Sequence, residues 1–93
     1  MVVPTTSMPA RPIGEDDTVD LNGKRVPAFQ TLTRNAAVGS AGHLPCLTLP
    51  AGVTGDGLPV GMEFVGPAVG DAPILALGRA LQRAFPAIPG PPV

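Results

Sequence analysis

Hydrophobic positions gather in two short runs near the middle of the chain and in one amphipathic segment near its end. The two runs, residues 46–49 and 60–65, contain a single hydrophilic side chain each, Thr48 and Glu63. A strand with one face in water alternates apolar and polar positions, so such runs are typical of strands covered on both faces. The pattern therefore predicts two buried strands.

The connection between the two runs favours a β-hairpin. It contains Asp56-Gly57, a pair that often forms tight turns, although the connection is longer than the shortest two-residue type. A hairpin alone is at best marginally stable, and covering both of its faces takes more layers than two short helices provide. We therefore expect further layers that these residues do not supply.

The amphipathic segment predicts the clearest helix. Asp71 is its expected N-cap, Pro73 suits the first turn, and apolar side chains follow at spacings of three to four. These side chains are Ile74, Leu77, Leu81 and Phe85. Gly78 lies on the same stripe, where it either permits close approach of another backbone or weakens the helix by about 1 kcal/mol relative to alanine.

A second helical pattern covers residues 27–41. Pro27 suits the first turn of this helix, and three apolar residues share one face of it. They are Phe29, Leu32 and Ala36.

The first 23 residues show little regular structure. Val2 and Val3 indicate the end of a strand, and Asn22-Gly23 indicates a turn. The acidic residues 15–17 are interpreted as a solvated loop, because neither ligand spacing nor a turn glycine supports a cation site. We predict one partial domain over residues 1–85 and a flexible tail over 86–93, where prolines prevent a helix from continuing.

Composition leaves disorder open as an alternative. The 93 residues include 13 prolines and 12 glycines, a fraction that would suit a disordered tail. However, 44 % of the residues are hydrophobic and only 14 % are charged, with a net charge of −1, and this is typical of chains that fold. The charge balance excludes a basic nucleic-acid-binding surface and electrostatic attachment to a membrane. No apolar run approaches the roughly 20 residues of a membrane span and no export signal is visible, so we expect a cytoplasmic location.

The residues offer no complete catalytic or metal site. One cysteine and one histidine exclude an internal disulfide and a four-ligand zinc centre, and no cofactor-binding motif is present. Cys46 and His43 are spaced like a thiol–imidazole pair, but Cys46 opens an apolar strand, so we expect a buried, inert thiol. Ser7, Ser40 and Lys24 each stand alone, without a glycine-rich turn that would present a serine nucleophile.

Short motifs follow one another along most of the chain. They are Pro-Thr-Thr-Ser-Met-Pro-Ala at 4–10, Ile13-Gly14, Arg34-Asn35, Gly39-Ser40, Leu44-Pro45, Leu-Thr-Leu-Pro-Ala-Gly at 47–52, Asp-Gly-Leu-Pro-Val-Gly at 56–61 and Gly66-Pro67. With these motifs, the stretch from residue 4 to about residue 81 resembles the C-terminal part of the amidase signature family of hydrolases. The blocks at 47–52 and 56–61 are the most specific. The segment 13–27 looks more like the branch that contains indoleacetamide and mandelamide hydrolases.

The resemblance implies an α/β fold that is the C-terminal part of a large α/β/α mixed-sheet enzyme. Here that part would be a β-hairpin with two helices and long loops rich in proline and glycine. Such enzymes hydrolyse carboxamides to carboxylate and ammonia with two serines and a lysine, and the nucleophile lies in a Gly-Gly-Ser-Ser-Gly-Gly type segment. Neither that segment nor the lysine motif occurs in these 93 residues, so no catalytic residue is carried over. The resemblance thus implies a complementary N-terminal amidase portion as partner, with a small amide as ligand of the complete enzyme only.

One motif departs from the family. Where the family commonly has Asn-x-Gly, this chain has Ala41-Gly42-His43. Histidine tolerates a positive φ better than most residues, so we expect the turn to survive. Because pocket loops gather where strands begin, Asn35, His43 and Leu44 are the candidates for one wall of the substrate pocket. The alternative for all three is turn formation and core packing.

The leading prediction is a C-terminal segment of an amidase-like hydrolase that is inactive by itself. Two alternatives remain. One is a non-catalytic interaction module whose hairpin edge pairs with a partner strand, and the other is a largely disordered remnant.

Overall fold

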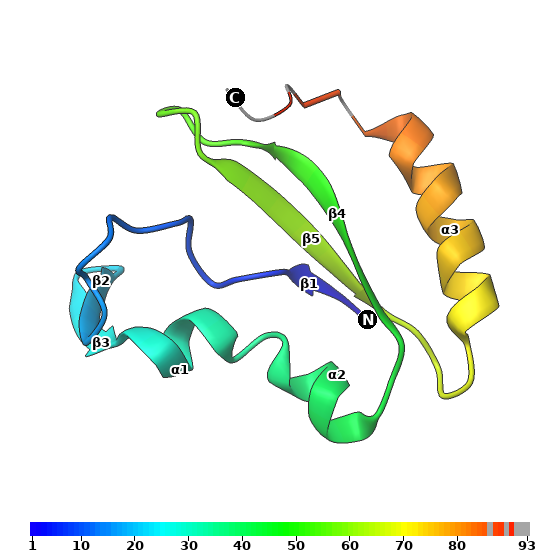
Figure 1. The fold of residues 1–93 in the computed structure, drawn as a ribbon, viewed down its shortest axis with the longest axis horizontal. Coiled ribbons are helices and arrows are strands. Elements are labelled where there is room, and N and C mark those ends of the chain that lie inside the picture. Colours follow the sequence, from blue (N-terminus) through cyan, green and yellow to red (C-terminus); the bar gives the residue numbers. More distant parts are fainter. Residues whose placement is uncertain (86, 89, 91–93) are drawn as a thin grey trace.

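The two apolar runs form the predicted hairpin at the centre of the chain. In the computed structural model, which describes residues 1–85, 87–88 and 90, β4 (Cys46–Val53) pairs antiparallel with β5 (Pro59–Val65). The register shifts between Pro50 and Gly52, so the hairpin contains a bulge. The predicted strand at Val2 and Val3 is confirmed as β1 (Val2–Pro4), which pairs with the other edge of β5. The strand order of this sheet is therefore β1-β5-β4 (Figure 1).

A second hairpin lies between β1 and the first helix. Strands β2 (Thr18–Leu21) and β3 (Lys24–Pro27) pair antiparallel around the predicted turn at Asn22-Gly23. Both turn residues have positive φ, 52° and 82°, as the tight turns that suit hairpins require. The turn is confirmed, but its flanking strands were not predicted because each has only four residues, two of them polar. The side chain of Val19 on β2 is fully buried.

The predicted helix over 27–41 is wrong as a single element. It is divided into α1 (Ala28–Thr33) and α2 (Ala37–Gly42). Two side-chain hydroxyls donate hydrogen bonds to helix carbonyls near the break. Thr33 Oγ1 donates to the Phe29 carbonyl at 2.7 Å, and Ser7 Oγ donates to the Thr31 carbonyl. Such bonds compete with regular helix bonding and often bend helices. The predicted apolar face is also wrong, since Phe29 is 73 % exposed whereas Ala28 and Thr31 are buried.

The last helix, α3 (Asp71–Ala84), is confirmed. Gly70 rather than Asp71 is the N-cap, and Asp71 lies in the first turn, where its charge suits the helix dipole. Ile74 is buried, and Leu81 and Phe85 pack beside it, whereas Leu77 is half exposed. These helix residues meet Leu49 and Phe64 of the hairpin in the core.

Close approach is the correct alternative for Gly78. A Cβ atom at Gly78 would lie 2.2 Å from Cδ2 of Leu47, and Gly78 is buried. The glycine therefore lets the backbone of α3 lie directly on β4.

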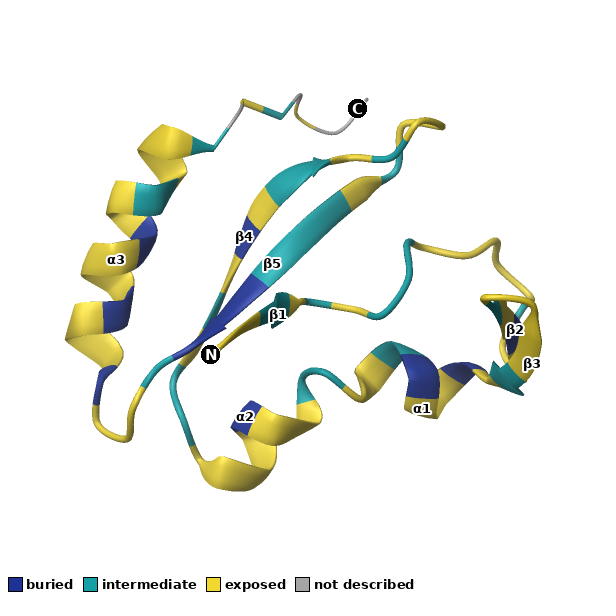
Figure 2. Cartoon of the chain, turned by 180° about the vertical axis from the view of Figure 1, so that it is seen from behind, coloured by how far each residue is buried: buried dark blue, intermediate teal, exposed yellow. Residues whose placement is uncertain are grey.

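The sheet runs between α3 on one side and α1 with α2 on the other (Figure 1). Alternation along β5 turns Phe64 toward α3 and Glu63 toward the opposite face. Burial on both faces is confirmed for the end of β5, where Glu63, Phe64 and Val65 are all buried. It is wrong for β4, which is partly exposed in Figure 2. Its exposed residues include Cys46 and Thr48. The expected buried thiol at Cys46 is therefore also wrong.

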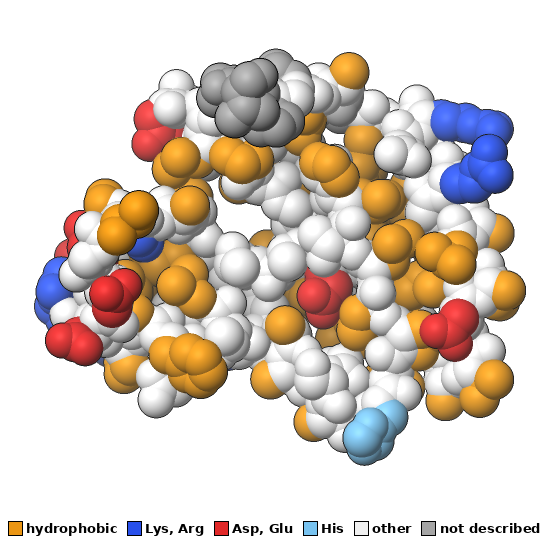
Figure 3. Space-filling model, viewed as in Figure 1, with side chains coloured by type: hydrophobic (Ala, Val, Ile, Leu, Met, Phe, Trp, Pro, Cys, Tyr) orange, Lys and Arg blue, Asp and Glu red, His pale blue; other side chains and the backbone are white. Residues whose placement is uncertain are grey.

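The chain exposes more surface than its mass predicts. Its accessible surface is 6565 Å², whereas a folded monomer of 9.4 kDa exposes about 5,000 Å². Its radius of gyration is 14.7 Å, against about 12 Å for a compact domain of this length. Hydrophobic side chains are spread over the visible surface in Figure 3. Val2, Phe29 and Val69 are each more than half exposed.

The end of the chain lies partly outside the described residues. α3 ends at Ala84, and Phe85 follows in an extended conformation. The predicted flexible tail over 86–93 includes five residues outside the description, so that tail and the domain boundary at residue 85 stay predictions. No helix within the described ranges is long and apolar enough to cross a bilayer.

Candidate functional site

The motif segment 4–10 is fixed to three elements of the fold. The Thr5 N–H donates to the Gly61 carbonyl at 3.0 Å, and the Thr5 hydroxyl donates to the Thr48 hydroxyl at 3.4 Å. Ser7 Oγ donates to the Thr31 carbonyl of α1. The segment therefore continues along the sheet from β1 and ends beside α1.

Gly61 makes this arrangement possible. A Cβ atom there would lie 2.9 Å from Thr5 Oγ1, 3.0 Å from Thr48 Cγ2 and 3.4 Å from the Leu49 carbonyl oxygen. The two threonine side chains meet over β5 only because residue 61 has no side chain.

A groove of about 310 Å³ separates segment 4–10 from the hairpin. Its lining residues are Pro4, Thr6, Ser7, Met8, Pro9, Ala51, Val60, Gly61 and Met62. None of these side chains is ionisable. Thr6 Oγ1 donates to the Met8 carbonyl at 2.7 Å, and the Ser7 hydroxyl proton is also engaged, as above. The groove can hold an apolar group but supplies neither a nucleophile–base pair nor a general acid.

The three predicted pocket residues lie in two places. Asn35 Nδ2 donates to the Pro4 carbonyl at 2.8 Å and so ties the turn between α1 and α2 to the beginning of segment 4–10. His43 is the C-cap of α2, with φ 53° and ψ 40°, which confirms the expected positive φ. The Leu44 N–H donates to the Gly39 carbonyl at 3.0 Å in the same cap. None of the three lines the groove, so their part in a pocket wall stays a prediction.

Cys46 and His43 show no catalytic pairing. The Cys46 thiol is exposed, and its hydrogen bond goes to the Leu44 carbonyl at 3.5 Å. A thiol becomes a strong nucleophile when a base or cation lowers its pKa, and a carbonyl does neither.

The acidic loop at 15–17 is solvated, as predicted. Glu15 forms an exposed ion pair with Arg11 at 2.8 Å, and such pairs contribute little to stability. Asp16 and Asp17 are exposed, and the described residues contain no group of three side chains able to hold a metal ion.

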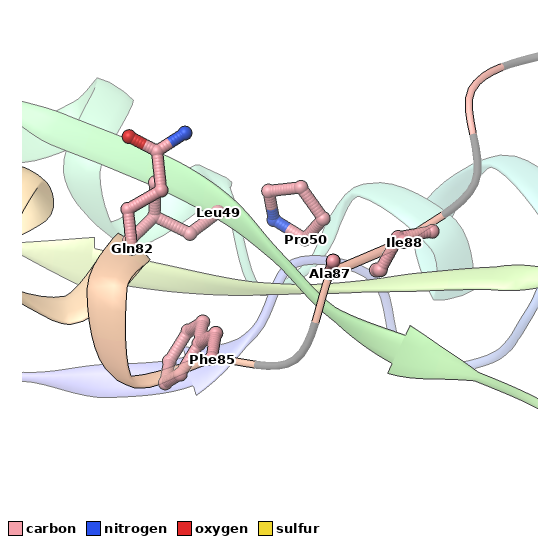
Figure 4. A pocket seen from close by; sticks show the side chains of 6 residues that line it. All are labelled: Leu49, Pro50, Gln82, Phe85, Ala87 and Ile88. Carbon is pink, nitrogen blue, oxygen red and sulfur yellow. The ribbon is translucent and has the colours of Figure 1, made fainter.

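One further cavity, of about 350 Å³, lies between β4 and the end of α3. Side chains from the strand, the helix and the segment after it surround this cavity (Figure 4). They are Leu49, Pro50, Gln82, Phe85, Ala87 and Ile88. Gln82 is the only polar side chain among them, so this cavity carries no catalytic group either.

Glu63 is the one hydrophilic residue of its run, and the sequence alone assigned it no role. The side chain is only 5 % exposed, and its Oε1 atom is fully covered without a hydrogen-bond partner in the described structure. A buried carboxylate oxygen without a donor is costly, so this position is unusual.

The family model described as Amidase matches residues 1–75. The chain belongs to the amidase family. It is 44 % identical over 85 residues to the indoleacetamide hydrolase of Agrobacterium vitis, a match that covers 91 % of this chain and 18 % of that protein. It is also 32 % identical over 92 residues to a glutamyl-tRNA(Gln) amidotransferase subunit of Methylocella silvestris, covering 99 % of this chain and 18 % of that protein.

A solved structure of an amidase shares the fold. A crystal structure described as an amidase superimposes with a TM-score of 0.83 at 29 % identity, covering 91 % of this chain and 19 % of that one. The predicted resemblance and the α/β amidase fold are thereby confirmed. The chain spans about a fifth of the length of these relatives and corresponds to a C-terminal segment of an amidase-like hydrolase.

Proposed function

We propose that this chain acts as the C-terminal part of an amidase that hydrolyses a small arylacetamide to carboxylate and ammonia. The carrying observation is the 44 % identity, over 91 % of this chain, to a protein named indoleacetamide hydrolase. In this proposal a complementary N-terminal portion supplies the two serines and the lysine. No cofactor takes part, and the location is the cytoplasm.

The chain contributes scaffold and pocket wall rather than the reacting groups. The groove beside segment 4–10 is lined by apolar side chains and hydroxyls, which suit an aromatic acyl group. Asn35 holds the beginning of this segment through the Pro4 carbonyl. His43 and Leu44, at the α2 cap and outside the groove lining, are proposed as part of the pocket wall of the complete enzyme. The 93 residues by themselves do not hydrolyse amides, because no serine in the described structure is hydrogen-bonded to a base.

Reconstitution tests this proposal. The 93-residue chain is co-expressed with the Agrobacterium vitis enzyme from which the aligned segment has been removed, and ammonia release from indole-3-acetamide is measured. Hydrolysis is expected from the combination and from neither part alone. A chimera of the full-length relative that carries these residues in place of its own segment provides the second measurement.

Two results would contradict the proposal. Hydrolysis by the purified 93-residue chain would refute its inactivity alone. An inactive combination together with an inactive chimera would refute the assignment as a working amidase part.

The second candidate is a non-catalytic interaction module. Two observations favour it: the outer edges of β1 and β4 have no neighbouring strand in the described sheet, and the accessible surface is large for the mass. The hairpin offers only its β4 edge, because β1 occupies the other edge of β5. A well-dispersed amide NMR spectrum from the isolated monomer, combined with an inactive reconstitution, would favour the module.

A further inference from the structure

Glu63 occupies a position that the chain itself leaves unsatisfied. It is the one buried ionisable side chain among the described residues. Its cross-strand neighbours are Val3 on β1 and Thr48 on β4. Val3 has no polar side chain, and the Thr48 hydroxyl, which accepts a hydrogen bond from the Thr5 hydroxyl, does not donate to Oε1 in the described structure. The described structure gives Oε1 no donor from either strand.

The face that carries Glu63 is also the less covered face of the sheet. α3 packs on the opposite face, against Leu49 and Phe64. On the Glu63 side, Gly39 of α2 lies against the Cys46 side chain, whereas Thr48 of the adjacent strand is exposed. The buried carboxylate therefore borders sheet surface that is open to another layer of protein.

The excess accessible surface and the share of the relatives' length that the chain covers indicate which protein layer covers this face. The chain exposes roughly 1,500 Å² more than a monomer of its mass, which exceeds the roughly 800 Å² that each partner contributes to a standard interface. The chain also spans only 18 % of the length of its indoleacetamide hydrolase relatives. The rest of the amidase fold is large enough to cover this area.

We infer that the Glu63 face docks the complementary N-terminal portion of the amidase, and that this portion supplies a hydrogen-bond donor to Oε1 of Glu63. The inference rests on the proposed function and names the contact at which the two portions meet. Because Oε1 is covered in the described structure, the Glu63 side chain must rotate for its carboxylate to meet the docked donor. Burial of the pair then strengthens the bond, because a charge-assisted hydrogen bond is strong in a site from which water is excluded.

The substitution Glu63→Met separates the effect of the carboxylate on the stability of the isolated chain from its effect on docking. Glu63→Met keeps a similar length and removes both oxygens, while Asp71→Asn on the opposite side of the sheet serves as the matched control. Urea unfolding is measured on each isolated 93-residue chain. The Kd for the remainder of the Agrobacterium vitis enzyme is measured by biolayer interferometry, with each chain held through a C-terminal tag.

Opposite effects of one substitution are expected. Glu63→Met raises the urea midpoint of the isolated chain, because an unpaired buried carboxylate is removed. The same substitution raises Kd at least tenfold, or about 1.4 kcal/mol, because the donor loses its acceptor. Asp71→Asn leaves Kd within about twofold of the unmodified chain, since this exposed charge lies on the side of the sheet away from the docking face.

Four results would overturn the inference. An unchanged Kd for Glu63→Met would show that no donor meets Glu63, and a lower urea midpoint would show that the chain already pairs this carboxylate. If the unmodified chain neither binds the remainder nor gives an active chimera, the proposed function fails and the inference fails with it. If the excised remainder does not fold, the same variants are compared in the chimera, where Glu63→Met is expected to lower the Tm and an unchanged Tm refutes the contact.

Discussion

The contact between Gly78 and Leu47 predicts that the effect of one substitution depends on the other. Replacing Gly78 by alanine inside α3 gains about 1 kcal/mol of helix propensity. In the native fold the new Cβ would lie 2.2 Å from Cδ2 of Leu47, roughly 1.3 Å closer than an ordinary carbon–carbon contact. Displacing a packed side chain in this way costs about 1–3 kcal/mol.

The net effect is therefore unfavourable in the native background, by up to about 2 kcal/mol. When Leu47→Ala is already present, the clash is absent, because the nearest atoms to the added Cβ are Cδ2 and Cγ of Leu47. Gly78→Ala is then expected to stabilise the chain by about 1 kcal/mol. The coupling energy between the two positions is about 1–3 kcal/mol, within the range known for residues in contact.

The assay is a double-mutant cycle by urea unfolding followed by circular dichroism. Ala80→Gly, at an exposed position of the same helix, calibrates the propensity difference and is expected to cost about 1 kcal/mol in both backgrounds. If Gly78→Ala raises stability equally in the native and in the Leu47→Ala background, the backbone of α3 does not lie on β4 and the reasoning is refuted.

Two further predictions concern exposed groups. Cys46 reacts with iodoacetamide in the isolated chain at the rate of an accessible thiol and is slowed in the reconstituted amidase, with Cys46→Ser as the unreactive control in mass spectrometry. Resistance of the isolated, folded chain to alkylation would show that the thiol is covered. The Thr54 hydroxyl and a backbone hydrogen bond hold the pKa of Asp56 below its ordinary value. A lowered folded pKa stabilises the hairpin turn above the unfolded pKa and ceases to do so as pH falls through the folded value. Thr54→Val is therefore expected to raise the Asp56 pKa in a carboxyl NMR titration, and an unchanged pKa would exclude the hydroxyl as its cause.

Strong local patterns predicted the hairpin and α3 well. The apolar runs around Asp56-Gly57 and the stripe through Ile74 and Leu81 combine periodicity with turn or end signals, and both elements form where expected. The strand at β1 was also correct, although its three residues meet β5 about sixty residues away.

The misplaced elements depend on contacts that no local pattern encodes. The division of α1 from α2 involves hydroxyl bonds to the helix carbonyls, one of which comes from Ser7 in a distant segment. The hairpin of β2 and β3 buries Val19 completely, yet this side chain stands between polar neighbours in the sequence. Propensity for either element is weak, so tertiary contacts decide.

The sequence likewise predicted only part of the candidate site. The sequence motifs identified segment 4–10 and the α2 cap, but the groove is lined by residues distant in sequence, such as Met8 and Val60. The burial of Cys46 was mispredicted because the apolar character of a strand matches how it is covered in the complete amidase fold, and this chain is only part of that fold. In the described structure α3 packs on one side of β4, while on the other side Cys46 and Thr48 stay exposed although Gly39 of α2 lies against Cys46.

The difference between the predicted and the observed coverage of the hairpin strands bears directly on Glu63. The run 60–65 predicts a strand covered on both faces, and the end of β5 is indeed buried on both, yet the neighbouring face of β4 is open. A carboxylate within such a run would destabilise an independent module, because burial removes its water and the described chain returns no hydrogen bond to Oε1. In an amidase whose remaining portion donates to that oxygen, the same carboxylate specifies how the two portions fit together. The residue that weakens the isolated chain is thus the one that best separates the amidase proposal from the interaction module.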